Sequence, residues 1–434
     1  CTSLQELVLG KGVEKIGGNA FSNCTKLSRI EIEGNVEEIG SLAFYDTAVK
    51  ELEIGEGVSE LKQTFYALSA LEKIEVEEGN KAYAGEEGVL YNKEKTELIS
   101  YPQKKADIKE YKVLEGVERI KEGAFKYNGT VEEVELPESL KEIEKESFYY
   151  CQALQRIQIP DKVESIGANA FRNCTNLQEL ILGKGVEKIG GYAFSHCTKL
   201  SRIEIEGNVE EVDNSVFYDT AVTELEIGEE VSELKQTFYV LSTLEKIEVE
   251  EKNKVYASEE GVLYNKEKTE LICYPQKKAD ITEYKVLEGV ERIKEGAFRY
   301  NGTVEKVDLL GSVKNIGKNA FSNCTKLRRI EIGGNVEEID NSVFYNTAVT
   351  ELKVGEGVSE LKQTFYFLST LEQIEVEEGN KVYAGEEGVL YNKEKTELIC
   401  YPRGKADVRE YKVPEGVESI REYAFYQNTD IVKI

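Results

Sequence analysis

Residue types that build catalytic and metal sites are scarce in this sequence. Its 434 residues include no tryptophan, no methionine and a single histidine, His196. One histidine cannot form a zinc site that needs several, and no nucleophile, base and orienting group can be assembled around it. The sequence therefore predicts a protein that is not an enzyme and that uses no metal ion and no cofactor.

Long apolar stretches are missing as well. No run of 18 consecutive apolar residues occurs, so we expect no transmembrane helix and no direct membrane insertion. The first residues, CTSLQEL, are polar, do not resemble an export signal and already follow the pattern of the later sequence. The last residues, IVKI, break off within the same pattern. We therefore expect the chain to be a fragment of a longer repeat array.

Basic residues are outnumbered. The chain has 82 acidic and 55 basic residues, which gives a net charge of −27. Binding to nucleic acid depends on Lys and Arg side chains that neutralise phosphates, and docking on anionic lipid needs the same excess. The charge therefore argues against nucleic-acid and membrane partners and favours solubility.

The sequence is built from repeats at two scales. Residues 24–127, 197–300 and 324–427 are three copies of one block. The segments between them, 128–196 and 301–323, consist of whole units of 23 residues. This regularity predicts a repeat architecture over residues 1–434, as one solenoid without separate domains.

Each unit follows the pattern C/N-xx-L-xx-I-x-I-xxx-V-xx-I-xxx-A-F. Most units are 22 or 23 residues long and three are 37. Their leading apolar residues are Leu4, Leu27, Val49, Leu71, Ile108, Val131, Leu154, Leu177, Leu200, Val222, Leu244, Ile281, Val304, Leu327, Val349, Leu371, Val408 and Ile431.

The spacing within a unit predicts a short strand. In one unit Ile203 and Ile205 are two residues apart, so both point inward, while Arg202 and Glu204 face outward. The A-F pair that closes each unit places an aromatic plug in the interior. One coil cannot cover its own apolar edge, so we expect some 17 coils to stack around a continuous core.

The three long units contain an additional element. GVLYNKEKTELISYP (88–102) has a Val-, Leu- and Tyr-rich stretch, a polar NKEK turn and a second stretch that ends at proline. The same pattern recurs at 261–275 and 388–402. We expect three inserted β-hairpins.

The L-xx-I-x-I-xxx-V-xx-I-G-xx-A-F-xx-C pattern and the GVLYNKEKTELI hairpin resemble the BspA-like, or Treponema-type, leucine-rich repeats. The resemblance covers essentially the whole chain. It implies a leucine-rich-repeat solenoid, mostly β, with short parallel strands on the concave face and short strands or 3₁₀ turns on the convex face. It also implies a bacterial cell-surface or secreted protein of the adhesin or scaffold type.

The His196-Cys197 pair is a candidate for chemistry that the repeats argue against. His196 aligns with asparagine in sibling units, and the cysteine position accepts Asn, Asp and Leu elsewhere, as at Asn128, Asp46 and Leu68. Such a position requires a small or buried side chain at a turn, not a thiolate. Cysteines in successive coils are near enough for a disulfide, but parallel inward side chains favour free thiols.

Acidic runs are a second candidate. EVEEGN (75–80 and 375–380) and AGEEG (84–88 and 384–388) allow weak calcium binding, but they lack the spacing of a dedicated calcium loop. The preferred interpretation is a solvated charged face.

The outward strand positions are the most plausible binding surface. They form a mixed ladder of charges, with a face of cross-strand ion pairs as the alternative interpretation. The candidate residues are Arg29, Glu31, Arg156, Gln158, Arg202, Glu204, Arg329 and Glu331. Tyrosines after the Phe plug are expected on the convex side, mainly to pack against the next coil, with a convex binding strip as the alternative. They are Tyr45, Tyr66, Tyr149, Tyr150, Tyr218, Tyr239, Tyr345 and Tyr366.

From these features we expect a non-catalytic cell-surface scaffold that binds a protein or glycan macromolecule on a host or neighbouring cell. The alternative is a structural stalk or spacer that displays another domain. Near-identical blocks fit a multivalent adhesin and a spacer equally well.

Overall fold

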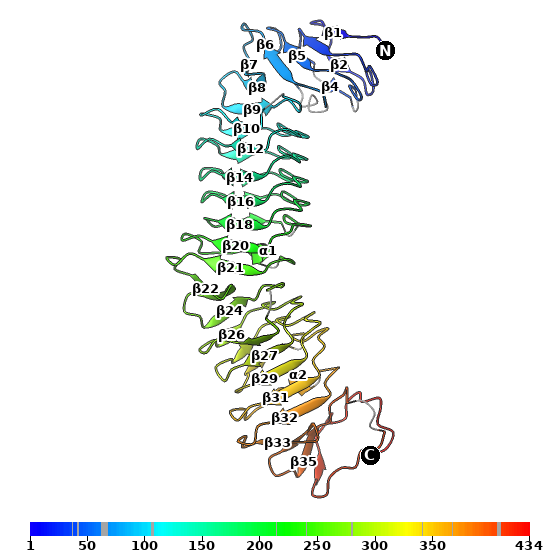
Figure 1. The fold of residues 1–434 in the computed structure, drawn as a ribbon, viewed down its shortest axis with the longest axis vertical. Helices are drawn as coiled ribbons and strands as arrows, with labels where there is room; N and C mark the ends of the chain where they lie inside the picture. The colour runs from blue at the N-terminus through cyan, green and yellow to red at the C-terminus, as the bar shows by residue number, and fades with distance from the viewer. Residues whose placement is uncertain are drawn as a thin grey trace. The chain divides into compact units, whose positions relative to one another are not determined.

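The computed structural model describes residues 1–434 apart from 37, 41–42, 62–67, 106–107, 214, 240, 279–280, 341, 367 and 406–408. The chain forms two compact units, Cys1–Phe238 and Tyr239–Ile434. Each is a stack of coils, about 17 turns in all, which confirms the predicted mostly β solenoid (Figure 1). That residues 1–434 form one continuous domain stays a prediction. Val408 and Tyr66 lie outside the described residues, as do the side chains of Tyr239 and Tyr366.

Nearly every described coil contributes one longer strand to one of three parallel sheets. Residues one coil apart pair directly, as Ile157 does with Leu180. In the first unit these strands are β1 (Glu6–Leu9), β3 (Arg29–Ile32), β5 (Glu51–Ile54), β6 (Lys73–Val76), β10 (Glu110–Lys112), β12 (Glu133–Glu135), β14 (Arg156–Ile159), β16 (Glu179–Leu182), β18 (Arg202–Ile205) and β20 (Glu224–Ile227). In the second they are β21 (Lys246–Val249), β25 (Glu283–Lys285), β27 (Lys306–Leu309), β29 (Arg329–Ile332), β31 (Glu351–Val354) and β32 (Gln373–Val376). These are called the long strands below.

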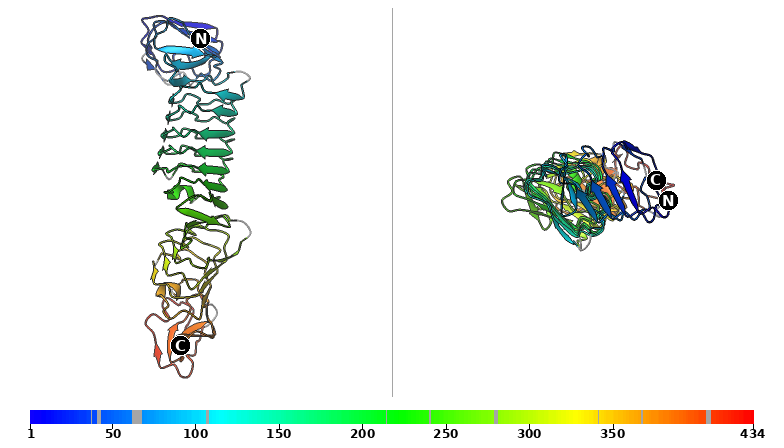
Figure 2. Two further views of the ribbon diagram at one scale, coloured as in Figure 1. Left: turned by 90° about the vertical axis from the view of Figure 1, so that its left-hand side faces the viewer. Right: turned by 90° about the horizontal axis from the view of Figure 1, so that it is seen from above.

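A second parallel ladder of two-residue strands runs beside the first. Its residues come from the V-xx-I part of the repeat, and in most of these strands one side chain, such as Ile143 or Ile166, is buried, although Ile420 of the last strand is exposed. In the first unit the short strands are β2 (Lys15–Ile16), β4 (Glu38–Ile39), β11 (Arg119–Ile120), β13 (Glu142–Ile143), β15 (Ser165–Ile166), β17 (Lys188–Ile189) and β19 (Glu211–Val212). In the second they are β26 (Arg292–Ile293), β28 (Asn315–Ile316), β30 (Glu338–Ile339) and β36 (Ser419–Ile420). The two ladders lie on different sides of each coil (Figures 1 and 2).

The phenylalanine plugs form a continuous stack inside the coils. Phe148, Phe171 and Phe194 lie at centroid separations of 4.8 and 5.0 Å with nearly parallel planes. Such offset aromatic contacts add to the stabilisation from burial. The backbone supports the stack, because the amide of Phe171 donates to the carbonyl of Ala193 in the next coil at 2.7 Å.

The turn after each plug explains the residues found there. His196, Asn173 and Asn323 all have φ near +60°, a left-handed conformation that asparagine tolerates better than most residues. The following cysteine points inward, and its thiol donates to a carbonyl of the preceding coil, as Cys197 does to Phe171 at 3.2 Å. The predicted turn position is therefore confirmed, and all eight cysteines are free thiols.

Asparagine replaces the cysteine directly after a hairpin coil. The Asn301 side chain, fully buried, donates to the carbonyls of Pro275 and Gln276 and accepts from the amides of Thr303 and Val304. Cysteine has one thiol hydrogen and cannot satisfy this set of partners. Asn128 makes the equivalent bonds in the first unit.

The predicted hairpins are confirmed, with one correction. Each contains a third strand ahead of the two expected ones, and all three strands pair antiparallel. The last strand then continues the ladder of short strands, since β9 pairs parallel with β11. The hairpin strands are β7 (Tyr83–Glu86), β8 (Val89–Asn92), β9 (Glu97–Ser100), β22 (Tyr256–Glu259), β23 (Val262–Asn265), β24 (Glu270–Cys273), β33 (Tyr383–Glu386), β34 (Val389–Asn392) and β35 (Glu397–Cys400).

The hairpin coil takes part in the aromatic stack through a tyrosine. Tyr101, just before the hairpin proline, stacks on Phe125 at 4.8 Å and occupies the place of a plug. Beside it the hydroxyls of Tyr91 and Tyr111 are 2.5 Å apart. The hairpins are therefore built into the core. The described helices are the one-turn segments α1 (Gln236–Tyr239) and α2 (Gln363–Tyr366).

Candidate binding face

The outward-facing side chains of the long strands are mostly charged. The three RIEI strands β3, β18 and β29 share one burial pattern, in which the isoleucines are buried and the arginine and glutamate are partly exposed. The predicted alternation is therefore confirmed for Arg29, Arg202 and Arg329. We call the outward side chains of the long strands the outward ladder.

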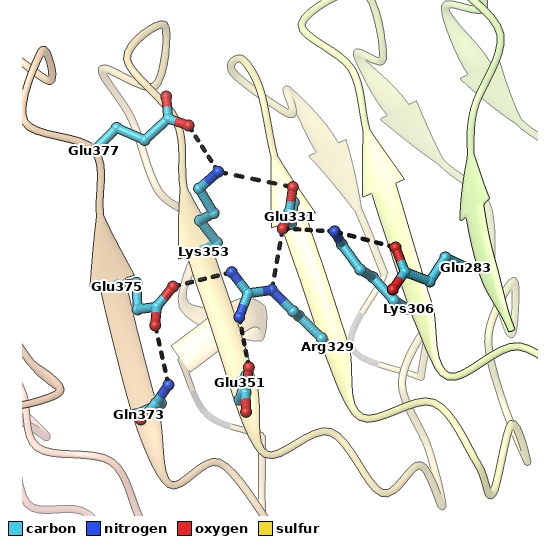
Figure 3. A network of polar contacts seen from close by, with 9 residues as sticks. All are labelled: Glu283, Lys306, Arg329, Glu331, Glu351, Lys353, Gln373, Glu375 and Glu377. Atoms are coloured by element: carbon cyan, nitrogen blue, oxygen red, sulfur yellow. Dashed lines mark hydrogen bonds and ion pairs between the residues drawn. The ribbon is translucent and has the colours of Figure 1, made fainter.

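In the second unit Arg329 lies at the centre of an ion-pair network (Figure 3). Its guanidinium contacts Glu331 at 3.0 Å, Glu351 at 2.7 Å and Glu375 at 3.0 Å. Glu375 lies 46 residues further along the chain, so the guanidinium reaches two coils on. The arginine joins three neighbouring strands.

Glu331 is the carboxylate with the most ion-pair partners in this network. Lys306 approaches it at 3.1 Å and Lys353 at 3.8 Å, in addition to Arg329. Burial alone would raise the pKa of Glu331, but hydrogen bonds from Lys306 and Arg329 hold that pKa below its ordinary value. The Figure 3 network thus keeps its central carboxylate ionised.

Arg202 forms the equivalent network in the first unit. It binds Glu226 through two nitrogens, at 3.0 and 2.6 Å, and also contacts Glu179 and Glu204. Hydrogen bonding to Glu226 raises the pKa of Arg202 despite partial burial. The residue of the third copy that corresponds to Glu226 is Lys353. The strand after the arginine therefore carries a negative side chain at this position in the first unit's network and a positive one in the second unit's.

Arg29 has the same arrangement at the start of the chain. It pairs with Glu6 at 2.7 Å, with Glu31 at 3.8 Å and with Glu53. Its strand belongs to the sheet β1-β3-β5-β6, which is separate from the sheet that holds Arg156 and Arg202. The candidate residues therefore form distinct patches and no single site.

Arg156 and Gln158 lie beside a pocket on the outward ladder of β10, β12 and β14. The pocket has a volume of about 590 Å³, and Arg156 reaches Glu179 at 2.9 Å. The residues that line the pocket are Glu110, Tyr111, Lys112, Glu133, Val134, Glu135, Leu136, Glu138, Arg156, Gln158 and Pro160. Through Glu179 this pocket, called the β12 pocket below, adjoins the Arg202 network.

The β12 pocket coincides with a break in the charge pattern. From β14 to β20 the first outward residues of paired strands alternate in sign, as Arg156 with Glu179 and Glu179 with Arg202 do, whereas at the second outward position Glu204 is paired with Glu226. At β10 and β12, Glu110 is paired with Glu133. Like charges directly opposite each other are unfavourable, which leaves this part of the face negative and open to a cationic group.

Several members of these sites were not predicted from the sequence. They are Glu375, the pocket residues Glu110 and Glu133, and Glu377, which lies 2.9 Å from the Lys353 ammonium. The available signal was the coil-to-coil register, which shows where the alternation of sign fails. Ile181, placed outward by the repeat, is only 9% exposed because its coil neighbours cover it.

Among the turn tyrosines whose side chains are described, the prediction of packing against the next coil is wrong for three. Tyr45, Tyr218 and Tyr345 are 58%, 60% and 68% exposed, and each stands directly before the left-handed residue of its turn, Asp46, Asp219 or Asn346. Tyr149 does pack between coils, against Tyr127 of the preceding coil at 5.7 Å.

The His196-Cys197 pair does not form a reactive site. His196 points outward and its Nδ1 lies 2.8 Å from Asp219, whereas Cys197 is buried. Burial raises the pKa of the Cys197 thiol well above its ordinary value, which keeps it protonated.

Metal and membrane features can be assessed for the same part of the chain. Among the described residues no group of three or more His, Cys, Asp or Glu side chains is placed to hold a metal ion. The described helices, α1 and α2, are single turns, and neither is long and apolar enough to cross a membrane.

Comparison with known proteins identifies the repeat. The model of the BspA-type leucine-rich-repeat region matches residues 1–113, 118–245, 164–292 and 269–397. No curated protein sequence matches the chain.

Several solved structures are similar at low identity. A leucine-rich-repeat protein of Bacteroides ovatus is 23% identical, with 75% of this chain and 86% of that chain covered and a TM-score of 0.45. One of Eubacterium ventriosum is 21% identical, with 74% and 82% covered and a TM-score of 0.42. A leucine-rich cell-surface protein of Faecalibacterium prausnitzii is 20% identical, with 99% and 90% covered and a TM-score of 0.40.

Proposed function

We propose, from the premise that this chain belongs to the BspA-type leucine-rich-repeat family, that it is a non-catalytic scaffold for binding another macromolecule. Its partner is a protein or glycan on a host or neighbouring cell, and the chain acts at a cell surface or after secretion. The surface setting is an expectation from the family, and the binding role is argued from the outward ladder.

The observation that carries the proposal is the β12 pocket. In the Figure 3 network the charges satisfy one another, so a partner would have to compete there with existing ion pairs. At the β12 pocket Glu110 faces Glu133, and the nearby Arg156 is about half exposed. A partner with cationic and hydrogen-bonding groups gains most at this point.

Array binding followed by matched variants tests this proposal. The protein is applied to an array of glycans and matrix proteins, and any saturable ligand is measured again with Glu110→Gln/Glu133→Gln, which removes the two carboxylates that face each other at the pocket. Removing these two charges should weaken binding at least about tenfold. The control, Lys188→Ala/Glu211→Ala, removes an exposed ion pair from the short-strand side and should change Kd less than about twofold.

A stalk or spacer is the second candidate. The Arg202 and Arg329 networks favour it, because their side chains are engaged with one another across coils and reinforce the stack. A spacer should bind nothing saturably on the array. Saturable binding that the pocket variant leaves unchanged would place the contact outside the β12 pocket.

A further inference from the structure

Three tyrosines of the first unit lie close together at the turns that follow the phenylalanine plugs. Tyr127 and Tyr150 stand at the left-handed turn position of two successive coils, and Tyr149 directly precedes Tyr150. Their ring centroids are 4.8, 5.7 and 5.7 Å apart. Tyr127 is 47% and Tyr150 36% exposed, so the rings form an aromatic surface. We call these three residues the tyrosine patch.

The backbone places an arginine beside this patch. The Tyr127 amide donates to the carbonyl of Tyr149 at 2.8 Å, and the Tyr150 amide donates to the carbonyl of Arg172 at 2.9 Å. Arg172 therefore occupies in the next coil the position that Tyr149 has in its own. Burial raises the pKa of Tyr149, and the charges of Arg172 and Lys126 oppose this rise from nearby.

Arg172 has no acidic partner. Its guanidinium lies 5.4 Å from the centre of the Tyr192 ring, and its Nη1 donates to the side-chain oxygen of Asn169 at 3.3 Å. Its Nε is buried without an acceptor, and the described residues supply no ion pair to it. Lys126, the other cation at the patch, pairs with Glu146 at 2.5 Å. The charge of Arg172 therefore stays available to an anion.

The exposed tyrosines stand in an unfavourable backbone conformation. Tyr127, Tyr150 and Tyr192 have φ of 63°, 60° and 59°, a region that bulky residues rarely adopt. Sibling coils have asparagine at the same turn positions, as at Asn173 and Asn169. Because much of each ring is in solvent, packing in the core does not account for the tyrosines. Strain of this kind is concentrated at functional sites.

The chemistry of these groups selects one kind of ligand. Each ring offers an apolar face, and its hydroxyl can donate and accept. Arg172 adds donors that suit a carboxylate. A sugar that carries a carboxylate combines an apolar ring face, hydroxyls and one negative charge. An acidic peptide lacks the sugar face, and a polyanion is repelled by the net charge of −27.

We propose that the tyrosine patch and Arg172 bind a glycan that ends in a carboxylated sugar. The sugar ring packs on Tyr127 and Tyr150, and its carboxylate accepts from the guanidinium of Arg172. Tyr192 holds that guanidinium through a cation–π contact. The site lies on other residues than the β12 pocket and takes a ligand of opposite charge, so the inference goes beyond the proposed function.

Titration of the full chain with small acidic glycans tests the proposal. The probes are sialyllactose, which ends in a sialic acid, and cellobiouronic acid, which ends in a uronic acid. Lactose and cellobiose are their uncharged controls. Calorimetry at physiological salt should show saturable binding of an acidic probe, at least about tenfold tighter than that of its control. The probe that binds more tightly identifies the source of the carboxylate.

Sibling residues supply variants that keep the turns intact. Arg172→Ser installs the residue found one coil later at Ser195 and should reduce the affinity for the acidic probe to that for its uncharged control. Tyr127→Asn/Tyr150→Asn relieves the left-handed strain, so it should not lower the melting temperature. It should still weaken binding at least about tenfold.

The second unit provides a matched control. Arg299 lies 4.9 Å from the centre of the Tyr300 ring, but the next coil has Ser322 and Asn323 in place of the tyrosine pair. Arg299→Ser removes the same charge as Arg172→Ser, away from the patch, and should change Kd less than about twofold.

The opposite results would overturn the proposal. Absence of saturable binding by both acidic probes would do so, as would unchanged binding in Arg172→Ser. Equal binding of a peptide of alternating Asp and Ser would mean that charge alone attracts the ligand, which also contradicts it. The Glu110→Gln/Glu133→Gln variant should bind the probes normally, so failure of the array experiment and failure of this one are distinguishable.

Discussion

The two sides of strands β14 to β20 follow opposite rules. On the inward side, four successive coils stack nearly identical apolar residues, each at most 1% exposed: Ile157, Leu180, Ile203 and Leu225. On the outward side the same coils alternate in charge through Arg156, Glu179, Arg202 and Glu224.

The difference follows from how like residues interact when they are stacked at strand spacing. Identical apolar side chains gain from contact with one another, so repetition improves the core. Identical charges at that spacing repel, so repetition outside is unfavourable unless the sign alternates or an opposite charge bridges the pair, as Arg202 does for Glu204 and Glu226. The inward side can thus be copied unchanged, whereas the outward side carries the differences between coils.

Removing an aromatic plug from the inward side should lower the free energy of unfolding more than any other change considered below. Phe171→Ala opens a cavity between Phe148 and Phe194 and should lower the free energy of unfolding by about 3–5 kcal/mol. Urea denaturation followed by circular dichroism measures it. Tyr218→Ala, which removes an exposed ring of similar size, should cost less than about 0.5 kcal/mol. Equal losses from the two would mean that the stack does not stabilise the core.

Replacing a buried polar residue should cause the second-largest loss of stability. Asn301→Ala leaves the carbonyl of Pro275 and the amide of Val304 without partners and should cost about 2–3 kcal/mol. Asn301→Cys introduces the residue that regular coils use and should recover only part of this loss, because one thiol hydrogen replaces two donors. Full recovery would contradict the account of the post-hairpin position.

Substitutions on the outward side should lower the stability less, and the loss should depend on the salt concentration. Arg202→Ala removes contacts with Glu204 and Glu226 and should cost about 1 kcal/mol at low salt. At 1 M NaCl the loss should shrink, since exposed pairs are screened. Denaturation at two salt concentrations checks this, and a loss that stays constant with salt would indicate packing as the source.

The turn position should be nearly neutral. His196→Asn installs the residue found in sibling coils at the same left-handed φ and should change stability by less than about 0.5 kcal/mol. Replacement by Val should destabilise the turn, because a β-branched residue resists that conformation. Thermal melts of the two variants compare them directly. A large effect of His196→Asn would mean that its contact with Asp219 matters more than the backbone.

Local patterns made much of the fold predictable. The alternation in RIEI and the spacing of Phe171 and Phe194 reflect strand period and coil length, which stay the same wherever the coil lies. β7 escaped prediction because YAGE lacks apolar alternation. This strand forms because Asn80 accepts from the amides of Ala82 and Tyr83 and fixes the turn before it.

The candidate sites were less predictable for a physical reason. The outward residues could be placed on one face, but which carboxylate Arg329 contacts depends on side-chain reach across two coils.

The shared coil geometry also bears on how the gene can change. The three copies begin at Cys24, Cys197 and Cys324, the same point of the coil each time. A recombination that joined His196 to Cys324 would delete whole coils, and the cysteine would again follow a left-handed turn residue. Length can therefore be inherited in steps of complete coils, and every junction formed in this way is a junction that the chain already contains.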